Sequence, residues 1–330
     1  MITVALEVTG SGWATTHQDL GRRDSERLGV PTGGAADQQS AAVANLLVGN
    51  PRGAPLLETL GPGLAVVPER EVLVALTGAD ATVTVGGVPT RCRTPVLVPA
   101  GHELRVHALH HGTRTYLAIH GRIEAPRFLG SVAPDARMGF GQVLASGDEV
   151  RVQSAWTGFR HGHFGQILLR PPVPTPAPAG TPIDVVAVDD VPVPGLRELV
   201  ADSAYIVTPR SNHVGLRLEG PVKHPDDDTE VVSHGVPIGA LEIPHVDELI
   251  VLGRYRTLTA GYPIVGVATR ASLPLLGQAG PGQTLRFRWV DRATAVHRAA
   301  EQETGLRALE RAAADAWAAL GLPGPCHHSY

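Results

Sequence analysis

Apolar and polar residues alternate along the first 155 residues in a way that is typical of β-strands. Residues 2–8, Ile-Thr-Val-Ala-Leu-Glu-Val, alternate as a half-buried strand does. Further short apolar runs follow, and turns containing glycine or proline separate them. We expect two strands within 56–67, and others at 72–80, 81–87, 95–101, 104–109 and 115–121. Many short strands at this spacing predict a sandwich or a barrel.

One stretch of the first half has a helical pattern instead. Ala41, Ala44, Leu47 and Val48 recur at helical spacing, and Asp37 stands where the N-cap of that helix is expected. The glycine pair at 33–34 marks a tight bend or a close approach to another group, because glycine adopts backbone conformations that other residues avoid.

The polar residues around this helix allow two interpretations. In the first, Asp37 caps the helix after an ordinary turn. In the second, a polar loop presents Gln18, Asp19, Arg22 and Asp37 to a ligand or a partner. The residues alone leave both interpretations open.

A proline-rich stretch, PPVPTPAPAGTP, begins at residue 171 and divides the chain near its middle. Such a composition favours an extended spacer. Beyond it we expect strands at 184–188, 204–208, 214–218, 240–243, 248–252, 264–269 and 284–289, a short helix at 194–202 and a long helix at 292–320. The predicted organisation is a mainly β N-terminal domain at 1–170, a linker at 171–183, a mainly β C-terminal domain at 184–290, and a helix with a tail at 291–330.

Composition and charge exclude several classes of protein. The chain has 330 residues, 43% of them apolar, with 38 glycines and 28 prolines, which suits many short strands joined by turns. Its net charge of -4 gives no basic surface for nucleic acid. We expect no membrane segment and no signal peptide, because no apolar run is long enough and the first residues lack a basic start. A cytoplasmic location is therefore expected.

The chain has fifteen histidines, but no metal site is expected from them. No carboxylate or third histidine stands at a recognised ligand spacing, and the motif H-E-x-x-H is absent. The second half instead carries polar turns at 209–221, 232–237 and 257–263, with strands between them. These turns either converge at one end of a barrel or are ordinary solvent turns, and the residues alone leave both interpretations open.

An ordered set of short motifs covers nearly the whole chain. The motifs are QDLGR (18–22), GVPTGGAAD (29–37), ANLLVGN (44–50), LETLGP (57–62), LTGAD (76–80), YLAIHG (116–121), LGS (129–131), SNHVGLRLEGP (211–221), SHGVPIGALEIP (233–244), TAGYPIVG (259–266) and LPLLGQAGPGQTLRF (273–287). Each is weak alone, but the set in this order is specific. It resembles the family of the C-type subunit of 5-oxoprolinase, also called allophanate hydrolase subunit 2 or the biotin-dependent carboxyltransferase-like family.

The resemblance implies a fold, an activity and partners. It implies two cyclophilin-like β-barrel domains, so that the expected fold is mainly β with a C-terminal helix. It implies a hetero-oligomer with a B-type 5-oxoprolinase subunit of similar fold and a third subunit of another fold. That complex would hydrolyse a small-molecule lactam or amide, opening 5-oxo-L-proline to L-glutamate with ATP, which would act through the complex.

Two other functions are compatible with the resemblance. The chain would be a non-catalytic scaffold or regulator that binds a partner like the B-type subunit. Alternatively, it would be a carboxyltransferase-like subunit of a biotin-dependent, urea-type carboxylase. The biotin would then have to come from a partner, because the attachment motif Ala-Met-Lys-Met is absent.

The sequence departs from the family pattern mainly in its second half. The resemblance leads one to expect Glu at His234, Arg at His213, and Asp at Tyr255. The turn at 257–263 reads Thr-Leu-Thr-Ala-Gly-Tyr-Pro in place of Gln-Thr-Thr-Gly-Gly-Tyr-Pro. Losing a carboxylate and a hydroxyl removes groups that would serve as a base or an anchor.

Two sets of site residues follow from the resemblance. Gln18, Asp19, Arg22 and Asp37 are expected to line one substrate site. The second set comprises Asn212, Arg217, His234, Thr259 and Tyr262, with Arg217, His234 and Tyr262 as the catalytic group. Arg217 would hold a substrate carboxylate through two hydrogen bonds, and His234 would carry a proton near neutral pH.

Overall fold

The computed structural model describes residues 2–156, 158, 180–188, 195–222, 232–245 and 248–319. The chain divides into two compact units. The first comprises Met1–Arg22, Gly33–Thr175 and Thr304–Tyr330, and the second comprises Arg23–Thr32 and Pro176–Glu303. Most of the predicted linker at 171–183 lies outside the described residues, so the predicted domain boundaries stay a prediction.

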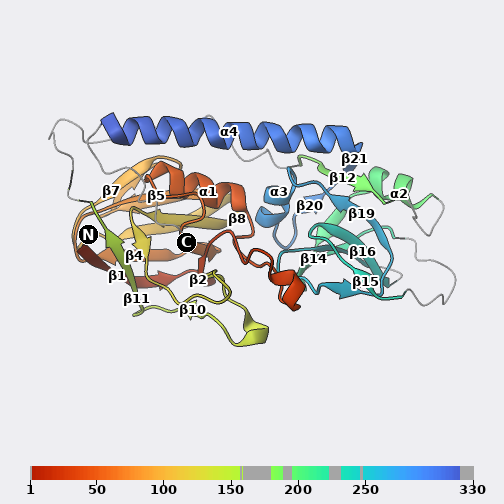
Figure 1. Ribbon diagram of the computed structural model, residues 1–330, viewed down its shortest axis with the longest axis horizontal. Coiled ribbons are helices and arrows are strands. Elements are labelled where there is room, and N and C mark those ends of the chain that lie inside the picture. The colour runs from red at the N-terminus through yellow and green to blue at the C-terminus, as the bar shows by residue number, and fades with distance from the viewer. Residues whose placement is uncertain are drawn as a thin grey trace. The chain divides into compact units, whose positions relative to one another are not determined.

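The first unit is built on one curled, barrel-like sheet. Its main path runs β10-β2-β3-β8-β4-β1-β11-β9, and β5 pairs with β8, β6 and β7 (Figure 1). The strands are β1 (Ile2–Ser11), β2 (Ala14–Gln18), β3 (Leu56–Leu60), β4 (Leu64–Pro68), β5 (Val72–Val85), β6 (Val88–Thr90), β7 (Pro95–Val98), β8 (Leu104–Ile119), β9 (Arg122–Ile123), β10 (Val143–Leu144) and β11 (Glu149–Ser154).

Two of these strands are longer than the sequence pattern predicts. The expected strands at 72–80 and 81–87 are one strand, β5, and those at 104–109 and 115–121 are one strand, β8. The predicted breaks are wrong because the polar and glycine positions there are bulges instead of turns. The β5–β8 register shifts around Asp80, and Gly78 and Gly112 both have a φ of 90°. A bulge bends a strand without ending it.

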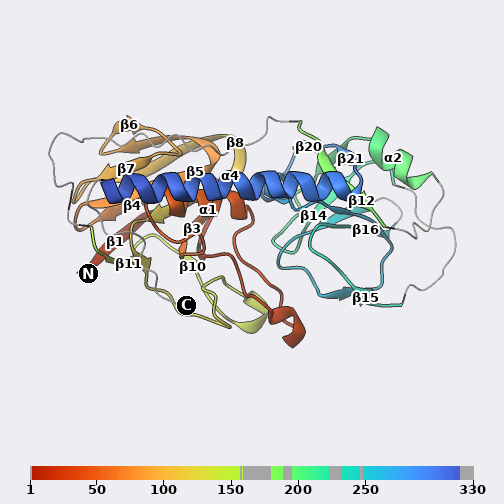
Figure 2. The ribbon, with the colours of Figure 1, turned by 45° about the horizontal axis from the view of Figure 1, so that its top comes forward.

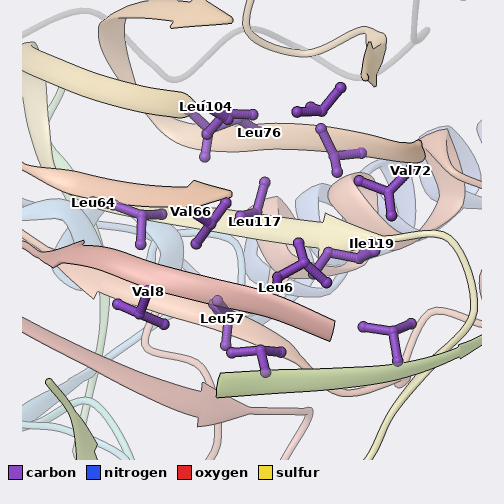
Figure 3. Packing of buried hydrophobic residues seen from close by; sticks show 14 of the residues in the cluster. Leu6, Val8, Leu57, Leu64, Val66, Val72, Leu76, Leu104, Leu117 and Ile119 are labelled. Carbon is purple, nitrogen blue, oxygen red and sulfur yellow. The ribbon is translucent and has the colours of Figure 1, made fainter. Parts of the chain in front are cut away.

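The inside of this sheet is an apolar core. Figure 3 shows Leu6, Leu57, Val66 and Leu117 gathered between the strands, with Ile119 beside them. The outer face of β5 and β8 is covered by α1 (Gln38–Leu47) and by the C-terminal part of α4 (Arg292–Ala319) (Figure 2). The predicted helix after Asp37 and the predicted long helix are therefore both present.

The second unit is a smaller curled sheet in the order β20-β13-β14-β17-β16-β19-β12-β21. The strands at the two ends of that order, β20 and β21, are separated in the chain by Arg286 alone, so the sheet curls back toward itself. The strands are β12 (Ile183–Ala187), β13 (Tyr205–Val207), β14 (Gly215–Glu219), β16 (Ala240–His245), β17 (Glu248–Leu252), β19 (Ile264–Ala268), β20 (Thr284–Leu285) and β21 (Phe287–Trp289).

Two short helices and a pair of two-residue strands also belong to the second unit. Helix α2 (Leu196–Asp202) is close to its predicted range, whereas helix α3 (Leu273–Gln278) was not expected. Strands β15 (His234–Gly235) and β18 (Thr259–Ala260) form a separate two-stranded piece. The fold is therefore mainly β, with two barrel-like sheets and a long C-terminal helix, as predicted. None of the helices in the described part of the chain is long and apolar enough to cross a membrane.

The end of α4 that belongs to the first unit is held by three buried side chains. Leu309, Ala313 and Trp317 are spaced four residues apart, which places them on one face of the helix. Trp317 is 2% exposed, and its indole Nε1 has no hydrogen-bond partner among the described residues. The contribution of this side chain is thus packing of its ring.

We therefore expect Trp317→Ala to lower the free energy of unfolding by about 3–5 kcal/mol, the usual cost of removing a large buried aromatic. Trp317→Phe should lower it much less, because it keeps a ring and removes a buried donor without an acceptor. The control is Val296→Ala on the same helix, where the side chain is 64% exposed. Chemical denaturation followed by circular dichroism measures all three. Equal stability of Trp317→Ala and the control would show that the face does not pack as described.

Candidate functional site

The predicted site residues fall into different units. Gln18, Asp19, Arg22 and Asp37 belong to the first unit, and Asn212, Arg217, His234, Thr259 and Tyr262 belong to the second. Each set is therefore considered on its own.

Asp19 fastens two loops of the first unit together. Its carboxylate accepts hydrogen bonds from Ser131 Oγ at 2.6 Å, from Val132 N at 2.9 Å and from Gly21 N at 2.8 Å. Its backbone carbonyl accepts from Ala35 N at 2.9 Å. The residue is 5% exposed. The carboxylate is thus occupied by structural contacts that join the 18–22 turn to the segment around Ser131.

Arg22 also contacts the segment around Ser131. The residue is 1% exposed, and its guanidinium donates to the carbonyl of Ala133. The guanidinium carbon lies 5.2 Å from the ring centroid of Phe128 and 5.9 Å from that of Phe140, which is the geometry of a cation–π contact. Gln18 is also buried, and its amide nitrogen lies 3.3 Å from Thr16 Oγ1.

Asp37 is the N-cap of α1, as the first of the two interpretations has it. Its Oδ1 accepts from Ser40 N at 2.9 Å, and its Oδ2 accepts from Ser40 Oγ at 2.5 Å. Its backbone N–H donates to the hydroxyl of Tyr116 at 2.8 Å. Burial beside Asp37 and Glu58 raises the pKa of the Tyr116 hydroxyl, so that it stays protonated. These contacts account for the burial of Asp37, and its expected role toward a ligand stays a prediction.

In the second unit, the strand pairing sets out a row of side chains on the outer face of the sheet. Arg217 of β14 pairs with Ile250 of β17, Ile250 pairs with Glu242 of β16, and Glu242 pairs with Ile264 of β19. Residues directly opposite each other point to the same face. We call Arg217, Ile250, Glu242 and Ile264 the outer-face row.

The residues that alternate with this row fill the core. Leu218, Leu249, Val251, Leu241 and Ile243 all belong to the buried cluster inside the sheet. Because successive side chains in a strand point to opposite faces, the outer-face row is directed away from that cluster. Adjacent strands lie about 5 Å apart, which puts the backbones of Arg217 and Glu242 about 10 Å apart.

The β15–β18 pair lies over part of the outer-face row, and we call it the cover. Val236, just after β15, and Ala260 of β18 pack against Ala240, Ile250, Leu252 and Ile264. Arg256 binds the segment that follows β15, because its Nε donates to the carbonyl of Val236 at 2.6 Å. The same guanidinium donates to Glu26 at 2.8 Å, which lowers the pKa of that carboxyl. Figure 1 shows β15 at the margin of the second unit, below β16.

Glu242 is the residue of this face that the sequence analysis missed. It is 3% exposed, and its Oε1 has no hydrogen-bond partner within the described residues. Burial raises the pKa of the carboxyl from 4.5 to about 7, and the charge of His234 acts in the opposite direction. A carboxyl in an apolar setting near neutral pKa is suited to exchanging a proton. The signal in the sequence was a lone Glu in an otherwise apolar strand, ALEIP.

Arg217 is already engaged by a carboxylate. Its guanidinium donates to Glu248 Oε2, and Nη2 of Arg210 lies 2.8 Å from Glu248 Oε1. Glu248 is 3% exposed, whereas the Arg217 side chain is 38% exposed. The ion pairs compensate the buried charge of Glu248, and the exposed part of Arg217 remains accessible from solvent. Arg217 therefore has a structural partner that a substrate carboxylate would share or displace.

His234 is half-buried at the start of the cover and near Glu242. Its Nδ1 lies 3.2 Å from the carbonyl oxygen of Val232. A carbonyl oxygen only accepts, so Nδ1 carries the hydrogen and Nε2 is the nitrogen that can take up a proton. Thr259 pairs with Gly235 in the cover and is exposed. His234 and Thr259 are thus brought together on one two-stranded piece.

The remaining two predicted residues lie at the edges of this site. Tyr262 follows β18 by two residues and is 41% exposed. Asn212 is exposed and shapes its own turn, because its Oδ1 accepts from Val214 N at 2.8 Å. Its contact is local, so the 209–213 turn behaves as an ordinary polar turn at this residue.

Two departures from the expected family pattern contact each other. The rings of His213 and Tyr255 have centroids 5.5 Å apart and planes at 84°, an edge-to-face pair. The resemblance leads one to expect Arg at 213 and Asp at 255, and in this chain an aromatic contact joins the two positions instead of charged side chains.

Removing the carboxylate of Asp19 should destabilise the first unit. Asp19→Ala leaves the N–H groups of Gly21 and Val132 and the Ser131 hydroxyl without their acceptor, so we expect a loss of about 3 kcal/mol in the free energy of unfolding. The control is Glu7→Ala, an exposed carboxylate on β1, with a change within about 0.5 kcal/mol. Urea denaturation measures both. A loss no larger than that of Glu7→Ala would contradict the structural role.

The raised pKa of Glu242 makes stability depend on pH. The folded state keeps the proton up to a pKa of about 7, whereas the unfolded chain releases it near 4.5. The carboxyl therefore destabilises the fold increasingly as pH rises through this window, by up to about 3 kcal/mol. Glu242→Gln should abolish this loss, so its stability gain over the natural chain is larger at pH 8 than at pH 4. A gain that is constant with pH, in denaturation at both pH values, would contradict this.

Comparison of the sequence with known proteins shows the family to which the chain belongs. Residues 28–289 match the family described as carboxyltransferase domain, subdomain A and B. The C-type subunit of the 5-oxoprolinase of Escherichia coli K12 is 32% identical over 291 residues, which cover 86% of this chain and 90% of that protein.

Two solved structures have a similar fold. The crystal structure of the Kluyveromyces lactis urea carboxylase is similar with a TM-score of 0.83 and 26% identity over 94% of this chain. The crystal structure of TTHA0988 is similar with a TM-score of 0.74 and 29% identity over 86% of this chain. This chain covers 29% of the first of those chains and 55% of the second. From the matched residues and the shared fold, this chain belongs to the carboxyltransferase domain family, subdomains A and B, and is a homologue of the C-type subunit of 5-oxoprolinase.

Proposed function

We propose that the chain is the C-type subunit of a 5-oxoprolinase complex. The observation that carries the proposal is the likeness to the corresponding Escherichia coli protein, which extends over 90% of that protein. In the proposed reaction, water opens the lactam of 5-oxo-L-proline. The carbon–nitrogen bond of the amide breaks, the carbonyl carbon becomes a carboxylate, and the nitrogen becomes the amine of L-glutamate. ATP is hydrolysed by the complex to drive the opening.

The second unit supplies groups suited to this reaction. Arg217 on the outer face has the fork geometry that binds a carboxylate through two hydrogen bonds, and 5-oxo-L-proline carries a carboxylate. His234 holds its Nδ1–H on a backbone carbonyl, which leaves Nε2 to carry a proton. Thr259, opposite Gly235 in the cover, is exposed and would bind the substrate. Tyr262, two residues after β18, is exposed and would belong to the catalytic group. In the first unit, Gln18, Asp19, Arg22 and Asp37 shape a second polar region that would serve the substrate or a partner.

The complex would contain two further proteins. A partner like the B-type subunit, of similar fold, and a third subunit of another fold complete it, and ATP is bound within that assembly. The name of the Escherichia coli relative, a subunit, supports the need for partners.

A second candidate function has its own support. The fold similarity to the Kluyveromyces lactis urea carboxylase favours a carboxyltransferase-like subunit acting with a biotin-carrying partner. In that case the ligand is urea, another small amide. In a third possibility the chain would be a scaffold or regulator without catalysis that binds a partner like the B-type subunit.

Co-expression with neighbouring-gene candidates for the B-type and third subunits tests the proposal. We expect a stable complex that releases L-glutamate from 5-oxo-L-proline only when ATP is present, measured by coupled glutamate detection. A complex that carboxylates urea from carboxybiotin instead would favour the second function. A stable complex with neither activity would favour the scaffold.

Two variants of the complex test the roles of the outer face. Arg217→Lys keeps a positive charge beside Glu248 but cannot bind a carboxylate as a fork, so we expect KM to rise by about tenfold or more. His234→Ala should lower kcat by about a hundredfold if it carries the proton. The control is Arg122→Ala, an exposed residue of β9 in the first unit. Kinetics like those of the control in both variants would remove these residues from the mechanism.

A further inference from the structure

Glu242 has an unmet capacity for hydrogen bonding. The residue is only 3% exposed, and Oε1 has no partner in the described part of the chain. A buried polar atom without a partner costs free energy, and native proteins contain few of them. Its neighbours on the outer face, Ile250 and Ile264, have apolar side chains that cannot form a hydrogen bond with the carboxyl.

The backbone around Glu242 is irregular on both sides. The β16–β19 register shifts between Leu241 and Glu242, and the β16–β17 register shifts between Glu242 and His245. Bulges of this kind re-aim a side chain and occur often beside functional sites. The strand therefore departs from regular pairing at the residue whose carboxyl oxygen lacks a partner.

The chemistry of a protonated carboxyl defines what it can bind. It presents an O–H donor and a carbonyl acceptor side by side. The matching ligand presents a carbonyl oxygen and an N–H on the same side. A small lactam ring has this arrangement because the ring forces the amide to be cis, and urea has it as well. An ordinary trans amide does not.

We propose that Glu242 is a ligand-binding residue whose carboxyl, in its neutral form, forms a pair of hydrogen bonds with the N–H and carbonyl of a cis amide. The choice of a lactam as the ligand rests on the proposed function, whereas the pairing itself requires only a cis amide. The carboxyl O–H donates to the ligand carbonyl, and the carboxyl carbonyl oxygen accepts the ligand N–H.

Arg217 extends this site to a second group of the ligand. Arg217 and Glu242 lie on the same face, with Ile250 between them, and their backbones are about 10 Å apart. Both side chains are long, so their polar ends can reach a small molecule above Ile250. A ligand that carries a carboxylate next to a cis amide, as 5-oxo-L-proline does, fits this order of groups.

A ligand would reach the carboxyl of Glu242 through the cover. Strands β15 and β18 are joined by the pairs His234–Ala260 and Gly235–Thr259, and Val236 N donates to the carbonyl of Leu258 at 2.9 Å beside them. Gly235 and Thr259 are exposed, so the ligand would enter by displacing this short pair, whose removal leaves the pairing of the core sheet intact. His234, at the end of the pair, is the titratable side chain that faces Glu242 from the cover, while the charged Glu248 of β17 is held by Arg217 and Arg210.

The test compares two ligands that differ only at the amide nitrogen. 2-Pyrrolidinone has the N–H, and N-methyl-2-pyrrolidinone lacks it. Binding is measured by ligand-observed NMR on the full-length chain, alone and in the co-expressed complex. We expect the natural chain to bind 2-pyrrolidinone at least about tenfold more tightly than the methylated ligand, as the loss of a buried hydrogen bond predicts.

Two variants then assign the effect to Glu242. Glu242→Leu should remove the preference and weaken 2-pyrrolidinone binding at least about tenfold, because it lacks both the donor and the acceptor. Glu242→Gln should keep binding within a few fold, because its amide also presents a donor beside an acceptor. Equal binding of both ligands by the natural chain, or a loss in Glu242→Gln as large as in Glu242→Leu, would overturn the inference.

Glutamate release from 5-oxo-L-proline separates this inference from the proposed function. Ligand binding with the expected pattern in a complex that releases no glutamate would sink the proposed function and keep the binding role of Glu242. Glutamate release with an unchanged KM in Glu242→Leu would keep the proposed function and sink the role of Glu242.

Discussion

The two-residue repeat of the second sheet is the constraint from which the candidate site follows. The core of this unit takes Leu218, Leu241, Ile243, Leu249 and Val251, and each of them fixes the direction of its neighbours in the strand. Arg217, Glu242 and Ile250 are turned outward as a result. A slip of one residue in register would place two charged groups in the core and lose the buried apolar area, so the register is strongly specified. The site is thus fixed by the same packing that stabilises the fold.

In the first unit, buried polar residues join loops to one another, and the sequence patterns could not distinguish this role from ligand binding. Asp19 and Arg22 both reach the segment from Ser131 to Ala133, one through its carboxylate and one through its guanidinium. The contacts of Asp19 with Ser131 and of Arg22 with Ala133 each span more than a hundred residues of sequence. A charged turn in a sequence shows that polar groups are present. Whether they face solvent, a ligand or another loop depends on long-range packing.

Much of the fold was predictable, because strand alternation and helix capping are local. Most second-half strands, α2, α4 and the capped α1 were expected close to their observed positions. The single strand expected at 284–289 was wrong, because the chain there passes from β20, paired with β13, to β21, paired with β12. The breaks predicted within β5 and β8 were wrong, because a sequence does not show whether a glycine lies in a bulge or in a turn. The cover was missed because two-residue strands carry too short a pattern. Glu242 was missed because the residues that pack over its face of the sheet, Val236 and Ala260, belong to segments on either side of it in the chain.

The cover also bears on how this kind of protein changes in evolution. In the genetic code, glutamate and glutamine codons differ by a single base, and both side chains have the same shape. A chain with Glu at 242 has a group that can give and take a proton under the cover, and a chain with Gln has a group that only binds. One nucleotide therefore separates a chain whose buried side chain at 242 can exchange a proton from a chain whose side chain of the same shape keeps a fixed donor and a fixed acceptor.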